Sequence, residues 1–579
     1  MKSCNFNLLK RQIQLVILTV ICCGVFLVAV PALATVTAPN IGEEITFFVD
    51  PAYDIKNRSR VSAIHQFTGT HAHIYIDAAY LNGLALEEKS VFLTKVKELL
   101  VEFDERIYPI TTQTFGTPWE PGIDNDLRIT IFITQLTETA AGYFNPRDEF
   151  ERATVPESNE REMLYLNTRF IAGGRAGGFV AHEFQHLISF YWKDKLLGAS
   201  DDIWLNEVRS EYVPALLGYD ALYSGSNLEH RVATFLKNPA DSLTEWRNSP
   251  YDYGSVALFA QYLADQYSAS IFREMMKSRS VGFASVEDAL RVLGKPMSFE
   301  EVFANWTIAN YLNDISANLR YGYLNSRLRA FRLPMTDVAS ATGEITFTTK
   351  DWANIGYRLF GNAQGTLTLT LSGNQSLPSS LRMSVVRLEN GKITVNSVAA
   401  SNGSLLAQEA YSPQATYLLI PFSKLSTSDF KESEPPRLLT LRVSTSSSTQ
   451  PIENVVQLLQ APMYPDGSLI RARGDYKVYI TKGQFKRHIV SADIFKFYGH
   501  LGFAQVIEVS PEELAQYKPS AWVRADGDPR VWEINGDGTK HWINIPGGQF
   551  APSGRDWAGV YIINTRERDW YTRGADVLR

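Results

Sequence analysis

Cysteine is nearly absent from this chain: three occur among 579 residues, at positions 4, 22 and 23. All three fall within the first 23 residues, so the chain beyond them has neither disulfides nor thiolate ligands for a metal ion. Histidine is also scarce, with nine residues in all. Because histidine is so rare, a regularly spaced histidine pair is uncommon by chance in such a chain.

An excess of positive charge is missing as well. The formal net charge is −6 at pH 7, which argues against nucleic acid or anionic membranes as partners. The chain is 45% hydrophobic and 12% aromatic, a composition that excludes a largely disordered protein. Its length is enough for about three domains with large cores.

The N-terminus has the pattern of an export signal. Lys2, Lys10 and Arg11 precede the apolar run "LVILTVICCGVFLVAVPALA", which closes on a small-x-small site at Ala34. We therefore predict a signal peptide over residues 1–34, a secreted or cell-surface protein, and no stable membrane insertion after cleavage. An uncleaved anchor is the alternative. Cleavage removes three of the 56 basic residues and none of the 62 acidic ones, so the net charge becomes −9.

The stretch "GGFVAHEFQHLISF", residues 177–190, places His182, Glu183 and His186 in one apolar run. On a helix, residues four apart share a face, so both imidazoles can bind one ion. Glu183 is rotated by about 100° from His182 and can reach a water molecule without being a ligand. This division of roles suits hydrolytic zinc. The alternative is a buried helix with two hydrogen-bonded histidines.

A second helix candidate follows in "DDIWLNEVRSEYVPALLG". Glu207 in this segment can supply the third protein ligand that a site with two histidines lacks. Glu211 lies one turn further along the same face and can accept the free N–H of a metal-bound histidine. An exposed helical glutamate is the alternative for Glu207.

HEFQH followed by W-L-N-E resembles the gluzincin class of zinc metallopeptidases. This resemblance implies Zn²⁺ as the cofactor, His182, His186 and Glu207 as ligands, and Glu183 as the general base. The run "NEVRSE" is similar to the thermolysin-type N-E-x-x-S-D, with Glu211 in place of the aspartate.

A closer resemblance is to the hyicolysin-like metallopeptidases, and it covers residues 45–325. It rests on four segments in order: "SNEREMLYLN", "HEFQHLISF", "WLNEVRSEY" and "YDYGSVALF". The resemblance implies an α+β zincin-type metallopeptidase domain, for which we set the limits 35–335. One departure is Val208-Arg209, where related sequences often carry glycine, and it touches no ligand.

Two tyrosines are candidates for stabilising the transition state. "SPYDYGSVALFAQYL" resembles the P-Y-x-x-G-x-x-x-L stretch of gluzincin aminopeptidases, whose tyrosine hydrogen-bonds the oxyanion. The match falls on Tyr251, with Tyr253 as the near alternative; aromatic packing at the start of a helix is equally compatible. The exopeptidase motif G-x-M-E-N is absent from the sequence, which favours cleavage within a chain.

The segment "REMLYLN", residues 161–167, alternates as a half-buried strand does. In zincins, an edge strand before the active-site helix pairs with extended substrate, and we assign that role to this segment; an ordinary sheet strand is the alternative. "EEKSVFLTKVKELLVEFDERIY" predicts a helix that the following proline ends. We interpret His71 and His73, which alternate on one strand, as packing residues.

The pattern changes near residue 340. Short, alternating, turn-punctuated segments predict a β-sandwich over 340–448, and a linker over 449–461 follows. Residues 462–579 contain a duplication that predicts tandem β repeats. Five residues recur 53 positions later: Arg471, Ala472, Gly474, Asp475 and Val478. Their Tyr, Trp, Lys and Arg content suits contact with glycans or cell wall, and a structural appendage is equally compatible.

The leading hypothesis is a secreted zinc endopeptidase that acts on protein or peptide substrates. Hydrolysis would proceed through a zinc-bound water activated by Glu183 as general base. The alternative is a surface or cell-wall-binding protein with a vestigial metallopeptidase domain, in which the C-terminal repeats carry the function. An aminopeptidase is a third hypothesis.

Overall fold

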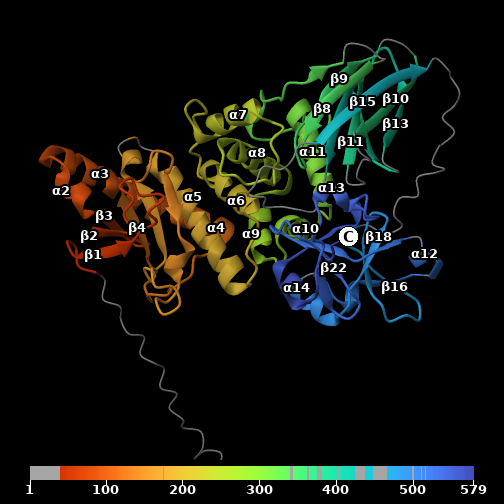
Figure 1. Cartoon of the computed structure of the whole chain (residues 1–579). Coiled ribbons are helices and arrows are strands. Elements are labelled where there is room, and N and C mark those ends of the chain that lie inside the picture. Colours follow the sequence, from red (N-terminus) through yellow and green to blue (C-terminus); the bar gives the residue numbers. More distant parts are fainter. Residues whose placement is uncertain are drawn as a thin grey trace, which may run out of the picture.

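The computed structural model describes residues 39–578, except 172, 174, 339–342, 362–363, 374–380, 402–403, 424–436, 447–463, 465, 499–500, 510 and 516. The expected signal peptide 1–34 and linker 449–461 lie outside these residues. Within the described part, none of the helices combines the length and the apolar character needed to cross a bilayer. The predicted mixture of α and β structure with several separate sheets is confirmed (Figure 1).

A mixed sheet forms the N-terminal part of the chain. Among the described residues it has six strands in the order β1-β2-β3-β4-β6-β5. The strands are β1 (Glu44–Phe48), β2 (Arg60–Thr68), β3 (Ala72–Asp77), β4 (Ile129–Thr134), β5 (Gly142–Phe144) and β6 (Met163–Asn167). Strands β3, β4 and β6 run parallel, and β5 is antiparallel to β6. The central strands are buried on both faces, which explains apolar runs such as ITIFIT in β4.

The edge-strand assignment made from the sequence is wrong. All five residues of β6 are buried, and β6 lies between β4 and β5 rather than at the edge. The edge position belongs to β5, which has three residues, Gly142, Tyr143 and Phe144. A strand this short contains too few residues for an alternating pattern to be recognised in the sequence. The substrate-pairing role was therefore assigned to the longer neighbouring segment, residues 161–167.

Helices cover one face of this sheet and continue beyond it. They are α2 (Ala78–Gly83), α3 (Leu86–Glu102), α4 (Tyr108–Phe115), α5 (Ala176–Ser189), α6 (Ile203–Leu216), α7 (Asn227–Lys237), α8 (Pro250–Tyr267), α9 (Ser270–Lys277), α10 (Gly282–Val292) and α11 (Phe299–Leu312). Pro109 does not end the predicted helix, because a π-helical turn, Phe103–Ile107, leads directly from α3 into α4. Pro109 lies in the first turn of α4, where the N–H that proline lacks is needed least.

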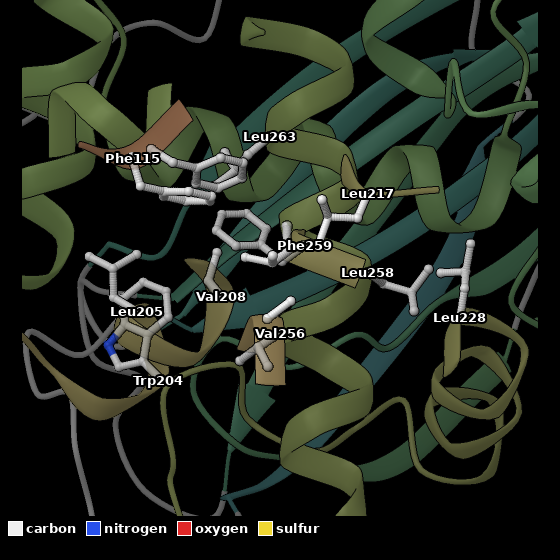
Figure 2. Close-up of a cluster of buried hydrophobic side chains, with 14 of the residues drawn as sticks. Phe115, Trp204, Leu205, Val208, Leu217, Leu228, Val256, Leu258, Phe259 and Leu263 are labelled. Carbon is white, nitrogen blue, oxygen red and sulfur yellow. The ribbon is translucent and has the colours of Figure 1, made fainter. Parts of the chain in front are cut away.

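The helices share one apolar core, part of which Figure 2 shows. Side chains of α6, including Trp204 and Val208, point toward Val256 and Phe259 of α8. Helix α7 also packs on α8, where a Cβ on Gly254 would come within 2.9 Å of the backbone nitrogen of Phe235. Glycine at this position therefore allows the close approach of the two helices.

Residues beyond 335 form two packed sheets. In the described residues the sheet orders are β13-β10-β15-β8 and β12-β11-β14-β9-β7. The strands are β7 (Thr336–Asp337), β8 (Gly343–Thr349), β9 (Tyr357–Phe360), β10 (Gly365–Gly373), β11 (Leu381–Glu389), β12 (Lys392–Ala399), β13 (Leu405–Tyr411), β14 (Thr416–Ser423) and β15 (Arg437–Ser446). Leucines of both sheets meet in one core, as in a β-sandwich.

Trp352 joins this sandwich to the helices. Its ring contacts three phenylalanines of α10 and α11 at centroid distances of 4.9–5.1 Å: Phe283, Phe299 and Phe303. Its backbone has φ of 50°, a conformation that a bulky residue rarely adopts. Two hydrogen bonds hold that backbone, one donated to Ser423 O and one accepted from Leu243 N. The sandwich and the helical region therefore share a continuous core.

The C-terminal residues form two sheets with matching topology. Their orders are β19-β16-β17-β18-β20 and β24-β21-β22-β23-β25 among the described residues. The elements are β16 (Leu469–Ala472), β17 (Tyr479–Lys482), β18 (Phe485–His488), β19 (Val506–Val509), α12 (Pro511–Ala515), β20 (Lys518–Ser520), β21 (Trp522–Ala525), β22 (Val531–Ile534), β23 (Thr539–Trp542), α13 (Gly547–Phe550), β24 (Tyr561–Ile563), α14 (Thr565–Trp570) and β25 (Thr572–Arg573). Gly474 and its counterpart Gly527 have φ of 82° and 70°, which explains why glycine recurs at this turn.

The two copies are packed together. Arg487 of the first copy pairs with Glu567 of the second at 2.6 Å, and both side chains are almost fully buried. A common apolar core contains Phe485 and Ile494 from one copy with Val523 and Tyr561 from the other. The copies therefore form one unit, although the domain limits set from the sequence stay predictions.

We expect Trp352→Ala to destabilise the helical region and the sandwich together. Loss of a buried tryptophan costs about 3–5 kcal/mol. Urea unfolding followed by far-UV circular dichroism should show a lower midpoint for one shared transition. Tyr476→Ala, at a residue that is 81% exposed, is the matched control and should leave the midpoint unchanged. Two separate transitions, with only one of them shifted by Trp352→Ala, would contradict the shared core.

Candidate metal centre

Helix α5 carries the first two candidate ligands on one face. Its apolar face is fully buried, including Phe184, Leu187 and Ile188, and this face fixes the helix against the sheet. His182 and His186 lie on the opposite side, with side chains that are 14% and 12% exposed. The helical spacing seen in the sequence thus brings the two imidazoles together at the rim of the core.

Helix α6 brings Glu207 to the same point. The Nε2 atoms of His182 and His186 are 3.1 Å apart. Glu207 Oε2 lies 3.3 Å from His182 Nε2, and Glu207 Oε1 lies 3.4 Å from His186 Nε2. Metal–ligand bonds of about 2.0–2.1 Å at tetrahedral angles place neighbouring ligand atoms about 3.3 Å apart. These three residues could therefore hold a metal ion, and no other such group of three occurs in the described part of the chain.

The electrostatics of the three groups also favour a cation. Burial alone would lower the pKa of His182, but the adjacent Glu207 carboxylate and the charges of Glu183 and Glu211 raise it to about 9. Burial would raise the pKa of Glu207, but the two imidazoles lower it well below its usual value. Glu207 Oε2 is buried and accepts no hydrogen bond of good geometry. A buried carboxylate with an oxygen left unsatisfied fits a metal ligand.

Ser210 fixes the orientation of His186. Its hydroxyl donates to Gln185 Oε1 at 2.5 Å and lies 3.1 Å from His186 Nδ1. Because its proton goes to Gln185, the hydroxyl oxygen accepts from Nδ1–H, which leaves Nε2 of His186 with a free lone pair. Ser210 was not among the predicted site residues. Its position one helical turn after Glu207 is the signal that could have identified it.

Glu211 has the corresponding position beside His182. Its Oε1 lies 3.6 Å from His182 Nδ1, and its carboxylate is held by Arg231 at 2.6 and 2.8 Å and by Asn227 at 3.2 Å. A carboxylate on the Nδ1 side favours a proton there and a free Nε2. Arg231 balances the buried negative charge of Glu211, so the pair adds little net charge to the centre.

Glu183 lies between α5 and the edge strand. Burial raises the pKa of its carboxyl group, the neighbouring rings of His182 and His186 oppose this, and the charge of Glu207 adds to it. Phe144 of β5 donates a backbone hydrogen bond to the carboxylate. A Cβ on Gly142 would approach within 3.1 Å of Glu183 Cγ and 2.7 Å of Tyr165 O. Glycine in β5 therefore lets the edge strand pass close to this carboxylate.

The two candidate tyrosines differ in their surroundings. Tyr251 lies in the first turn of α8 and is 38% exposed. Tyr253 packs under Arg231, whose guanidinium lies 4.6 Å from the ring centroid, and donates to Asn248 Oδ1 at 3.0 Å. Burial, followed by the charges of Glu207, Glu211 and Glu183, raises the pKa of Tyr253 well above its usual value. Tyr253 thus lies within electrostatic range of the centre.

The two histidines of β3 and the loop before it serve packing, as expected. His71 stacks on Tyr108 with ring centroids 3.7 Å apart. His73 is buried, with Nε2 3.1 Å from Asp126 Oδ2 and Nδ1 3.1 Å from Thr68 Oγ1. The two rings therefore have separate partners and share no metal site.

Comparison with known proteins finds one informative relative. The neutral metalloprotease ShpI of Staphylococcus hyicus is 24% identical over 279 residues. The match covers 43% of this chain and 58% of that protein, so the chain spans little more than half the length of this relative. No family model matches the chain.

Two solved structures are similar to short parts of the chain. The pre-peptidase C-terminal domain of a Bacillus anthracis collagenase is 10% identical and covers 19% of this chain and 95% of its own, with a TM-score of 0.14. The lysozyme inhibitor PliG of Aeromonas hydrophila is 17% identical and covers 19% of this chain and 96% of its own, also with a TM-score of 0.14. TM-scores this low support no argument about function.

We expect metal binding at this centre to release a proton. At pH 7 the metal-free His182 is protonated, because its pKa of about 9 lies above the solution pH. A metal ion must displace that proton, so affinity should rise roughly tenfold for each pH unit up to about 9 and then level off. Calorimetry with zinc in two buffers of different ionisation enthalpy measures the number of protons released, which should be about one per metal at pH 7.

The same titration also tests whether Glu207 is a metal ligand. Glu207→Gln keeps the size of the side chain but removes the charged ligand, and it should abolish tight uptake of one metal ion per chain. Tyr476→Ala, remote from the centre in sequence and at an exposed position, should bind as the wild type does. Full metal stoichiometry in Glu207→Gln, or metal affinity independent of pH between 6 and 9, would contradict this centre.

Proposed function

We propose that this protein is a zinc-dependent endopeptidase with a zincin-type catalytic domain, exported from the cell to act on protein or peptide substrates. One observation carries the proposal: two imidazole nitrogens and the carboxylate of Glu207 approach one another within 3.4 Å, and half-buried Glu183 lies beside them, next to strand β5. The name of the Staphylococcus hyicus relative, a neutral metalloprotease, agrees with it.

The donor set fits zinc. Two imidazole nitrogens and one carboxylate oxygen leave a fourth tetrahedral position open, as catalytic zinc sites require. Zinc bound there would act as a Lewis acid toward a carbonyl oxygen and lower the pKa of water. His182, His186 and Glu207 would hold it, while Ser210 and Glu211 keep the Nδ1 protons in place.

Glu183 is the proton carrier of the proposed reaction. Its burial raises the pKa of its carboxyl group, which brings a carboxylate nearer to the range in which it both accepts and returns a proton near neutrality. The carboxylate takes a proton from the attacking water and returns it to the departing amine. The Phe144 backbone N–H orients the carboxylate toward the strand edge where the scissile bond would lie.

The edge of β5 is the proposed substrate platform. Asn167 N donates to Ala141 O, so residue 141 turns its carbonyl inward toward β6. Because hydrogen-bonding directions alternate along an antiparallel strand, Tyr143 also faces inward, while Gly142 and Phe144 direct their N–H and C=O groups outward. An extended substrate can pair with the two outward C=O groups and with the N–H of Gly142 by strand addition, while the N–H of Phe144 is donated to Glu183. Such binding needs no chain terminus, which favours an endopeptidase.

Two further parts of the hypothesis have different support. Export rests on the N-terminal sequence alone. Glycan or cell-wall contact through 462–579 also rests on the sequence: Trp532, Tyr561 and Tyr571 are buried in the core that the two copies share, whereas Tyr476, Trp557 and Trp570 are exposed. A vestigial metallopeptidase domain is disfavoured, because the ligands, the base and the orienting groups are all present together.

Replacing Glu183 by Gln should abolish peptide hydrolysis but not metal binding. The amide cannot accept a proton, so the rate of casein hydrolysis should fall by about 10²–10⁴-fold. Zinc content, measured by atomic absorption, should stay at the wild-type value. An N-terminally acetylated peptide should be cut internally by the wild type, which an aminopeptidase cannot do. Hydrolysis by Glu183→Gln at the wild-type rate would refute the base assignment.

We propose Tyr253, rather than Tyr251, as the donor to the oxyanion. The charges of Glu207 and Glu183 act on the Tyr253 phenol, and Arg231 packs over its ring. A phenol that gives up its hydrogen bond to Asn248 can donate to a developing negative charge instead. The sequence resemblance to aminopeptidases still supports Tyr251, which stays a prediction.

The matched pair Tyr253→Phe and Tyr251→Phe separates these two assignments. Removing a true oxyanion donor should lower kcat by about 10²–10³-fold with little change in KM. We expect this loss for Tyr253→Phe and a change of less than about threefold for Tyr251→Phe, measured with one quenched fluorescent peptide. The reverse order of effects would restore Tyr251 as the donor.

A further inference from the structure

The free edge of β5 is bordered by a tyrosine that comes from the loop between β1 and β2. The ring centroid of Tyr53 lies 4.7 Å from that of Tyr143, and the two planes differ by 19°. Tyr143 in turn stacks on Tyr165 of β6 at 4.1 Å and 7°. We call these three stacked rings, Tyr165, Tyr143 and Tyr53, the tyrosine ladder.

The tyrosine ladder extends one ring beyond the edge strand β5. Two rings that both stack almost parallel on Tyr143 cannot share one of its faces, so Tyr165 and Tyr53 flank it on opposite sides. Neighbouring strands lie about 4.7–4.9 Å apart, close to the spacing of the rings. The ring of Tyr53 therefore lies where a strand added to β5 would place a side chain opposite Tyr143.

Tyr53 is held there by the fold. Its carbonyl accepts from Thr137 N at 2.8 Å, and the next residue, Asp54, forms a β-bridge with Leu136. Asp54 is itself fixed by an ion pair with Arg58 at 2.7 Å. These contacts attach the loop to the segment that leads from β4 to β5. The ring of Tyr53 is therefore held in a fixed position beside the edge of β5.

The Tyr53 phenol also lies within electrostatic range of the metal centre. Burial raises the pKa of the Tyr53 phenol, and the charges of Asp50, Glu183 and Glu207 raise it further. The phenol group is thus within electrostatic range of the proposed base and of one ligand. Its side chain is half-buried, and its hydroxyl has no hydrogen-bond partner in the part of the chain that the structure describes.

We propose that Tyr53 is a specificity-determining residue that restricts one substrate position to small side chains. This rests on the proposed peptidase function. An extended substrate paired with β5 sends alternate side chains to opposite faces of the sheet. Side chains on the α5 face avoid Tyr53, but the one opposite Tyr143 on the ladder face meets its ring. Only glycine, alanine or serine leaves room for the ring at that position.

Cleavage-site mapping tests this directly. Wild type and Tyr53→Ala, both as full-length zinc-loaded protein, are incubated with a mixed peptide library, and the cuts are identified by mass spectrometry. The wild type should show small residues at one fixed distance from the cut. Tyr53→Ala should lose that preference at this position alone, with kcat/KM rising about tenfold or more for a peptide that carries Leu there. The matched alanine peptide should be cut equally by both.

Two variants separate bulk from other effects of the substitution. Tyr53→Phe retains the ring and should retain the preference for small residues, whereas Tyr53→Val removes the ring but keeps an apolar side chain and should relax the preference even where Tyr53→Ala fails to fold. Tyr476→Ala removes an exposed tyrosine from the C-terminal unit and should cut as the wild type does.

Binding without turnover gives an independent readout. In a Glu183→Gln background, fluorescence anisotropy with labelled alanine and leucine peptides should show that Tyr53→Ala tightens binding of the leucine peptide only. Identical cleavage profiles and affinities with and without the ring would overturn the role of Tyr53 alone. Absence of any cleavage by the wild type would overturn the peptidase function and this inference with it.

Discussion

The mutual approach of two imidazole nitrogens and one carboxylate, all within 3.4 Å in a nearly buried place, is the constraint on which the rest of the site depends. Without a cation, a carboxylate is costly to bury there, and a proton held on His182 partly compensates for it. The surrounding protein must therefore hold groups in place that would otherwise move apart or turn toward water.

The protein holds these groups with partners from several helices. Ser210 and Glu211, both on α6, face the two histidines of α5, while Arg231 of α7 neutralises Glu211. Gly254 permits the close packing of α7 on α8 that brings Arg231 within reach. Arg209, fully buried, pairs with Asp201 at 2.8 Å and so fixes the start of α6. Val208 beside it lies in the core, so the departure from glycine at these two positions serves packing.

The local part of this site could be predicted from the sequence, and the distant part could not. His182, Glu183 and His186 lie on one helix, so their relative geometry follows from helical spacing alone. Glu207 depended on a resemblance, because no local rule specifies how α6 crosses α5. Ser210 was missed because the position one helical turn after Glu207 was assigned to Glu211 alone, although Ser210 also lies one turn away. Tyr53 is more than a hundred residues from the histidines, and only the folded sheet brings it to the edge strand.

The short length of edge strand β5 explains why the substrate strand was assigned wrongly from the sequence. Segment 161–167 was assigned as the substrate strand because it is long enough to show an alternating pattern of side chains. Long strands, however, are typical of the interior of a sheet, where a strand has neighbours on both sides. A free edge is open to unwanted pairing with other chains, and short edges lower that risk. Strand β5 has three residues, one of which is a glycine. Tyr53 covers the side-chain position next to the strand on one face of the sheet. The features that protect this edge from indiscriminate pairing are the same ones that would select a substrate strand. A longer, open edge would bind more sequences, but it would also let other chains extend the sheet beside the proposed base, Glu183.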